Sequence, residues 1–337
     1  NEKGSVTLFI VISMLFFLIV LVLIYSQQTE KITVQKRQVG EIQKNYQTKN
    51  IEQIYQETYD KNKPKPVPTG IWVALEGNTL KFYTTEEKAI AGGGKIYGNV
   101  KGETFTRDNT DGVEEPTTPW YDDCAQIRHA EFVDPVAPEY MAYFFSDLKQ
   151  LETVDMTNVE MGNVTTMHGL FLNCNALTTI KTSEIDTSSV TDMGWMFLQC
   201  NNLTDLDVSK FDTSNVTNMY AMFHSCNKLT KLDVSNFDTS NVTSMGSMFA
   251  NMTALSQLDV SSFDTSKVTN MQTMFSKVSQ LEELDISSFD TRKVSDMGEM
   301  FSESRNLKKI YVGQNWKIAP NNKGMFNYCG TSTTTLK

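Results

Sequence analysis

The sequence predicts an α/β solenoid with a parallel sheet, preceded by a small β-rich module and a long N-terminal α-helix. The first observation is a 26-residue repeat that keeps its register from Phe145 to Leu307. The second is an apolar run of 20 residues from Val6 to Tyr25. A fixed period indicates a solenoid, because one unit cannot bury its own apolar face and must stack on its neighbours.

Two residue types mark the register of the repeat. The first is a phenylalanine in every copy: Phe145, Phe171, Phe197, Phe223, Phe249, Phe275 and Phe301. The second is a leucine in every copy: Leu151, Leu177, Leu203, Leu229, Leu255, Leu281 and Leu307.

Residues 1–62 are predicted to form the long helix, whose apolar half is 6–25. At about 1.5 Å per residue, this half matches a hydrocarbon core of roughly 30 Å, and it equally suits the core of a helical bundle. The side chains expected in that core are Val6, Phe9, Ile12, Phe16, Ile19 and Leu23. A linker is predicted over 63–69, where alternating prolines favour a stiff, extended chain.

The β-rich module is predicted over 70–125. Its segments IWVALEG and LKFYTT carry β-branched and aromatic residues on either side of the turn Gly77-Asn78. The repeat solenoid is predicted over 126–314. The last segment, 315–337, leaves the repeat pattern and is predicted to cap the solenoid.

Within one copy, Leu232 and Val234 flank Asp233 in the alternation of a strand with one buried face. The stretch Asp238–Asn241 has the short polar side chains of a turn. The residues Val242, Met245, Met248 and Phe249 then follow at helical spacing, so a short helical or 3₁₀ segment is expected to return the chain.

An aspartate column is the candidate interaction face of the solenoid: Asp207, Asp233, Asp259 and Asp285. Because these residues alternate with buried ones, we expect them to point to solvent. A solvated acidic face is favoured over a calcium ladder, since calcium needs six to eight converging oxygens. A second column is expected to bond to turn N–H groups: Asp186, Asp212, Asp238, Asp264 and Asp290.

The cysteines Cys174, Cys200 and Cys226 share one repeat position, which Met252, Val278 and Ser304 occupy in later copies. Such a set favours buried thiols over a disulfide or a nucleophile. No arrangement of acid, base and nucleophile recurs, so the chain is predicted not to be an enzyme, with no catalytic residue, metal ligand or cofactor. The net charge of −10 argues against nucleic acid as a partner.

The copies LTDLDVSKFDTSNVTNMYAMFHSC and LTKLDVSNFDTSNVTSMGSMF resemble the BspA-type leucine-rich repeats of bacterial surface proteins. The preceding GIWVALEGNTLKFY and TPWYDD resemble the module that often introduces such repeats. The resemblance covers about residues 70–330 and implies a leucine-rich-repeat-like solenoid exposed on the cell surface. It further implies a link to adhesion and no enzyme activity.

The start KGSVTLF is similar to class III pre-pilin starts, especially those of type IV, Tad-like pilin proteins. It departs from them at Phe9, where pilins usually carry Glu. The sequence therefore predicts a pilin-like subunit of an extracellular bacterial filament. The filament is expected to be a helical homo-oligomer, and the subunit is expected to reside in the cytoplasmic membrane before assembly. The solenoid is expected to lie outside, on the cell surface or pilus, and to bind an unknown protein or glycan. The alternative is a monomeric adhesin anchored by a single membrane-spanning helix.

Overall fold

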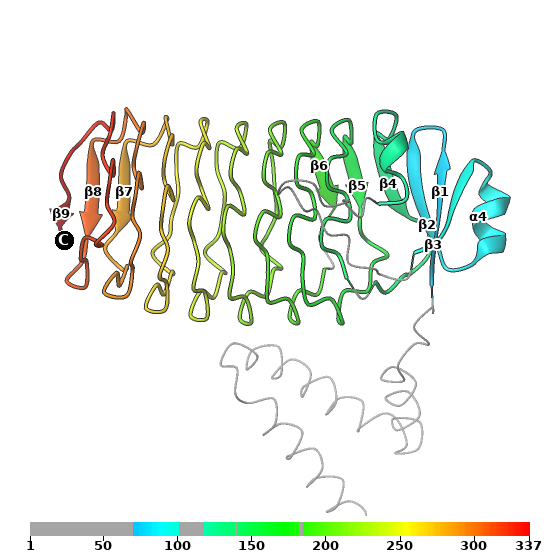
Figure 1. Ribbon diagram of the computed structural model, residues 1–337, viewed down its shortest axis with the longest axis horizontal. Helices are drawn as coiled ribbons and strands as arrows, with labels where there is room; N and C mark the ends of the chain where they lie inside the picture. Colours follow the sequence, from blue (N-terminus) through cyan, green and yellow to red (C-terminus); the bar gives the residue numbers. More distant parts are fainter. Residues whose placement is uncertain (1–69, 101–117, 139, 182–184) are drawn as a thin grey trace, which may run out of the picture. The chain divides into compact units, whose positions relative to one another are not determined.

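A computed structural model describes residues 70–100, 118–138, 140–181 and 185–337, all within a compact unit that spans Val67–Lys337 (Figure 1). The predicted helix 1–62, its six core side chains and the linker 63–69 lie outside the described residues. Among the residues that are described, no helix combines the length and apolar character needed to cross a membrane.

The unit begins with a small antiparallel sheet. Strand β1 (Ile71–Glu76) pairs with β2 (Thr79–Tyr83) on one side and with β3 (Lys95–Val100) on the other. Gly77 takes a φ of 62° in the turn that joins β1 to β2, a conformation in which its missing Cβ avoids strain. Helix α4 (Glu86–Gly92) connects β2 to β3, and the Thr85 side chain accepts a hydrogen bond from the N–H of Lys88 at its start.

The sheet then becomes parallel and leads into the solenoid. A 3₁₀ turn, η1 (Tyr121–Asp123), precedes β4 (His129–Phe132), which pairs in parallel with β2. β5 (Thr153–Asp155) and β6 (Thr179–Lys181) continue the sheet in the order β3-β1-β2-β4-β5-β6. Near the other end, β7 (Glu283–Ile286), β8 (Lys309–Val312) and β9 (Thr335–Leu336) form a second parallel sheet. The antiparallel module therefore covers the first edge of the stacked coils.

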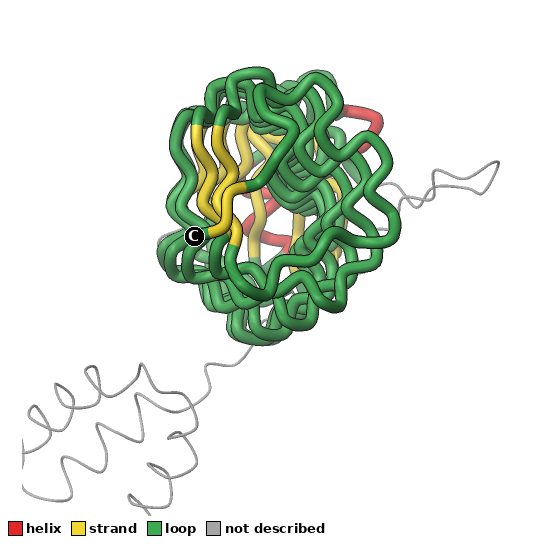
Figure 2. The backbone as a smooth tube through the Cα atoms, turned by 90° about the vertical axis from the view of Figure 1, so that its left-hand side faces the viewer, coloured by secondary structure: helices red, strands yellow, loops and turns green. Residues whose placement is uncertain are grey.

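A second ladder runs along another side of the coils, which Figure 2 shows stacked behind one another in end view. It consists of single parallel bridges between residues of adjacent coils: Thr166, Asp192, Asn218, Ser244, Asn270, Asp296 and Asn321. The last step, from Asp296 to Asn321, and the pairing of Tyr311 with Thr335 extend both ladders into 315–337, the segment predicted as a cap.

The short helical or 3₁₀ segment predicted in each repeat is wrong, because the structure has successive turns there, whose left-handed residues interrupt either kind of helix. Met248 donates its N–H to Met245 O (3.2 Å), but Ser247 donates to Gln272 O in the next coil (2.7 Å). Ser247 and Asn251 take φ values of 58° and 57°, in the left-handed region. Alternate N–H groups thus bond between coils, which an α-helix forbids because it uses them internally. The fold is a parallel β-solenoid of 26-residue coils rather than an α/β solenoid.

The core is a stack of aromatic rings and thioethers along the solenoid axis. The seven repeat phenylalanines are buried, and the ring centroids of successive copies lie 5.5, 5.6, 5.7, 6.0, 5.8 and 6.0 Å apart from Phe145 to Phe301. The methionines of the repeat, such as Met245 and Met248, fill the space beside these rings and are fully buried. The repeat period therefore places one ring in each layer of the core.

Candidate functional site

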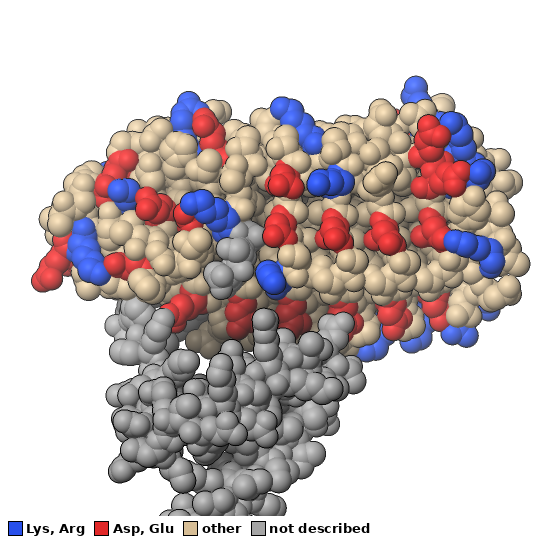
Figure 3. Space-filling model, turned by 180° about the vertical axis from the view of Figure 1, so that it is seen from behind, with Lys and Arg blue, Asp and Glu red and all other residues tan. Residues whose placement is uncertain are grey.

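The predicted aspartate column lies on the outside of the coils, and its last member, Asp285, belongs to strand β7. Asp233 is exposed, whereas its neighbours Leu232 and Val234 are 5% and 0% exposed, as the alternation predicts. Figure 3 shows a row of acidic side chains along this part of the surface. The column Asp207, Asp233, Asp259 and Asp285 is thus brought together in the register of the coils.

Each aspartate of this column also has a local bonding role. Oδ1 of Asp207, Asp233, Asp259 and Asp285 accepts the N–H of the serine two residues on, at 2.9, 3.0, 2.9 and 3.0 Å. Hydrogen bonds from the hydroxyl and N–H of Ser235 lower the pKa of Asp233 below its usual value. The recurring acid therefore has a structural reason in the turn that it closes, independent of any ligand.

Lysines bound the acidic column at both ends. Lys181 forms an ion pair with Asp155 (2.6 Å) before the column, and Lys337 pairs with Asp285 at its end. Partial burial of Asp285 raises its pKa, but hydrogen bonds from Lys337 and Ser287 outweigh this effect and lower the pKa to about 2. In the part of the chain that the structure describes, no three His, Cys, Asp or Glu side chains converge as a metal site would require.

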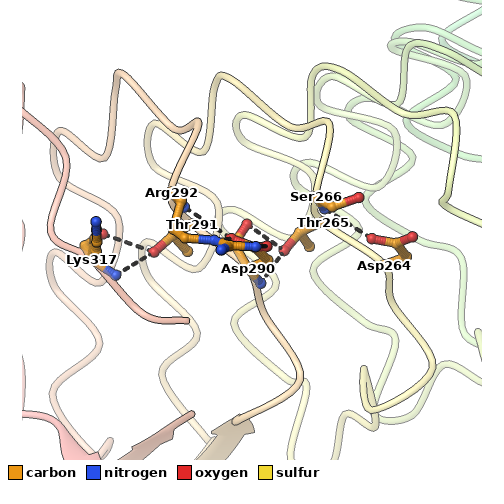
Figure 4. Close-up of polar contacts among 7 residues, drawn as sticks. All are labelled: Asp264, Thr265, Ser266, Asp290, Thr291, Arg292 and Lys317. Atoms are coloured by element: carbon orange, nitrogen blue, oxygen red, sulfur yellow. Dashed lines mark hydrogen bonds and ion pairs between the residues drawn. The ribbon is translucent and has the colours of Figure 1, made fainter. Parts of the chain in front are cut away.

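The second aspartate column closes turns and adjoins a buried threonine column. Asp264 Oδ1 accepts the N–H of Ser266 (2.9 Å), and Asp290 Oδ1 accepts that of Arg292 (3.1 Å). Figure 4 shows how the hydroxyl of Thr265 joins two coils: it donates to Asp290 O (3.0 Å) and accepts the N–H of Asp290 (2.8 Å). These bonds confirm the prediction that the second aspartate column caps turn N–H groups.

The repeated thiols are buried within the solenoid. Cys174, Cys200 and Cys226 are each 0% exposed, and no disulfide joins them. Each Sγ donates to a phenylalanine carbonyl 29 residues earlier, such as Phe145 O for Cys174 (3.0 Å). Burial raises the pKa of all three thiols, so they lack the thiolate character of a nucleophile. The hypothesis of buried thiols is confirmed.

Residues 139–233 and 226–337 match the model of a family described as "Mycoplasma protein of unknown function, DUF285". These two matches cover more than half of the chain. The chain belongs to this family. The DUF285 matches include every coil from the first full repeat to the last residue, in agreement with the BspA-type repeats expected from the sequence. No curated protein matches the chain.

A row of aromatic side chains on the DUF285 coils was not among the sites expected from the sequence. We name it the aromatic strip, and it consists of Tyr143, His168, Trp195 and Tyr220, one from each of four consecutive coils. The imidazole of His168 lies 5.4 Å from the Tyr143 ring and 4.9 Å from the Trp195 ring, measured between centroids. The backbone continues the row, since Trp195 donates its N–H to Tyr220 O (2.9 Å).

The signal for this strip lies in the two variable residues of the motif MxxMF, whose second Met is replaced by Phe144 and Leu170 in the first two copies. They read AY, HG, GW, YA, GS, QT and GE in successive copies. In the copies that follow each aromatic residue, a Gly or Ala occupies the same position: Gly169, Gly194, Ala221 and Gly246. A comparison between copies at single positions would have found this pairing, whereas a search for residues that recur in every copy could not.

Proposed function

We propose that this chain is a non-enzymatic binding protein of the bacterial cell surface, in which the solenoid presents variable side chains on a constant scaffold. The observation that carries this proposal is the division of roles within each coil. Inward positions repeat the same residue type, whereas one outward position of the coil changes from copy to copy: Asp205, Lys231, Gln257, Glu283 and Lys309, all exposed. Constant buried positions with varied exposed ones suit recognition along a solenoid surface.

We further propose that the apolar run 6–25 provides the N-terminal attachment of the solenoid, as the core of a pilin-like filament, and that the proline-rich segment 63–69 serves as the connector. The support is the sequence: 20 residues without charge and alternating prolines behind a predicted helix. The alternative, a monomeric adhesin held by one membrane-spanning helix, uses the same run.

The test uses cells that produce the full chain. Antibody against the solenoid should label intact cells, and brief protease treatment of those cells should release the solenoid. Absence of labelling, with the chain present in lysates, would refute surface display.

Electron microscopy of sheared surface material separates the two modes of attachment. In the filament mode, antibody decorates filaments, and Ile19→Asp abolishes them while the solenoid keeps its circular dichroism spectrum. A matched control is Thr7→Ser, which keeps the apolar run nearly unchanged. Labelled membranes without filaments would support the single-pass anchor.

A further inference from the structure

The two tyrosines of the aromatic strip each lie over a glycine of the next coil. A Cβ added at Gly169 would lie 2.6 Å from Cδ1 and Cε1 of Tyr143, and one at Gly246 would lie 2.9 Å from Cε2 of Tyr220. Contacts below about 3.0 Å are not tolerated, so these positions admit no side chain while the rings stay in place. The Tyr143 and Tyr220 rings therefore extend along the axis onto the next coil, where glycine makes room for them.

The rings of the strip remain partly open to solvent. Tyr143, Trp195 and Tyr220 are neither buried nor fully exposed, and the His168 side chain is 22% exposed. The repeat phenylalanines of the core, by contrast, are fully buried. Later coils carry the polar residues Gln272, Thr273 and Glu299 at the strip positions, so the fold of a coil does not require a ring there.

Hydrogen-bonding groups lie in a fixed arrangement beside the rings. Oδ1 of Asp192 accepts the N–H of Gly194 (2.8 Å) and Nδ2 of Asn218 (2.9 Å), and it lies 3.1 Å from Nδ1 of His168. All three contacts involve Oδ1, and the Asp192 side chain is 34% exposed. Among contacts with described residues, Oδ2 takes no part, so it is available to accept a hydrogen bond from a ligand hydroxyl.

The combination of aromatic faces and fixed acceptors matches the chemistry of a sugar chain. Aromatic faces carry partial negative charge, and the C–H bonds of a pyranose ring, which are weakly positive, pack against them. A carboxylate and an amide beside the rings can bond to the neighbouring hydroxyls. Successive coils lie about 4.8 Å apart, close to the length of one pyranose ring, so consecutive sugars can meet consecutive coils.

Charge narrows the class of glycan and disfavours nucleic acid. The chain carries a net charge of −10, and the ladder position beside the strip holds Asp192 and Asn218 rather than Lys or Arg. A nucleic acid would also stack on the rings, but its phosphates require cationic side chains for affinity. An acidic polysaccharide would likewise be repelled by the negative charge of the chain and would find no Lys or Arg at these positions.

We propose that the aromatic strip of Tyr143, His168, Trp195 and Tyr220 binds a neutral, linear oligosaccharide along the solenoid axis, with Asp192 and Asn218 as hydrogen-bonding partners. This inference rests on the proposed binding function and assigns its ligand class and surface. Four rings on four coils set the length of the bound segment at about four sugars, given one sugar per coil.

The experiment measures binding of the full chain to oligosaccharides of one to six sugars prepared from cellulose, chitin, laminarin and mannan. Heparin oligosaccharides and poly(dT) serve as anionic comparators. Titration calorimetry and tryptophan fluorescence report binding. We expect at least one neutral series to bind, with affinity that rises up to about four sugars and then levels off.

Variants of the strip locate the site. Trp195→Ala should weaken the affinity for the oligosaccharide by about tenfold or more. Trp195→Phe should retain part of that affinity. Tyr220→Ala, on the next coil, should weaken it separately. The matched control is Gln272→Ala, an exposed residue two coils beyond Tyr220 at the same repeat position, which should bind like the unmodified chain. Unchanged melting temperatures show that the variants are folded.

Several results would overturn the inference: no binding in any neutral series, binding of the anionic comparators alone, or affinity that Trp195→Ala and Tyr220→Ala leave unchanged. If the full chain then still binds a protein ligand or a host surface, the ligand class is wrong while the binding function stands. If surface display itself fails in the antibody experiment, the proposed function fails separately from the affinity measurements.

Discussion

Truncation of one ring in the phenylalanine stack should strongly destabilise the solenoid. Phe249 is 0% exposed, and its ring lies 6.0 Å from that of Phe223, 5.8 Å from Phe275 and 6.4 Å from Phe263. A buried phenylalanine removes about 150–250 Å² from water, so burial at about 25 cal/mol per Å² gives roughly 4–6 kcal/mol as an upper limit. Alanine retains part of this area, which sets the expected loss for Phe249→Ala at about 3–5 kcal/mol.

The upper half of that range is expected because the cavity cannot easily collapse. The N–H of Phe223 donates to Met248 O (3.0 Å) and that of Phe249 to Met274 O (3.1 Å), so the backbone on both sides of the cavity is fixed between coils. The coils on either side keep their rings and hold the spacing open. Relaxation that would recover part of the lost packing is therefore restricted.

Urea unfolding of the full chain, followed by far-ultraviolet circular dichroism, measures the loss. Hydrogen exchange locates it, because a solenoid can open in sections. The control is Tyr328→Ala, whose side chain is 75% exposed and whose removal should change stability by less than about 0.5 kcal/mol. A loss below about 1 kcal/mol for Phe249→Ala would refute the assignment of the phenylalanine stack as the core.

Three further outcomes are expected. The pKa of Asp285 is lowered to about 2 in the folded chain. The stability that the ionised carboxylate adds to the fold is therefore present above about pH 4 and is lost as the pH falls towards 2. Melting temperatures across this range should fall less steeply for Asp285→Asn, and an identical slope would contradict the ion pair with Lys337. Iodoacetamide should modify the half-exposed Cys329 before the buried Cys200 in the native chain, as mass spectrometry of peptides would show; equal rates would argue against buried thiols. Gly313→Ala should cost about 1–3 kcal/mol by overpacking, since its Cβ would lie 2.0 Å from Ser287 O, and a neutral effect in urea unfolding would show that the last coil is loosely packed.

Much of the solenoid could be predicted from the sequence because its core repeats. The alternation of Leu232, Asp233 and Val234 indicated which side chains face inward, and all three lie as predicted. The aspartate-capped turns could also be predicted, since Asp238 accepts the N–H of Ser240 two residues on (2.9 Å), a bond within a single turn. These features depend on neighbours in sequence, so a local pattern contains them.

The predicted helical segment shows where periodicity becomes ambiguous. Apolar residues three apart, such as Met245 and Met248, face inward in an α-helix, and they also face inward in consecutive turns closed by bonds between residues three apart. The two conformations differ in the φ of residues such as Ser247, which no hydrophobic pattern records. The same limit applied to the aromatic strip, whose members alternate between two positions of the coil and do not share one residue type.

The coil length, the core residues and the aspartate-capped turns could be read from the amino-acid sequence, because they follow from hydrophobicity and from bonds between near neighbours. The left-handed residues, the N–H groups shared between coils and the packing of the strip tyrosines on the next coil became visible only in the folded chain. Those features join residues about 25 positions apart, as when Ser247 donates to Gln272 O. Their energy arises only after the coils stack, so the strand, turn and side-chain preferences of a single repeat do not contain them.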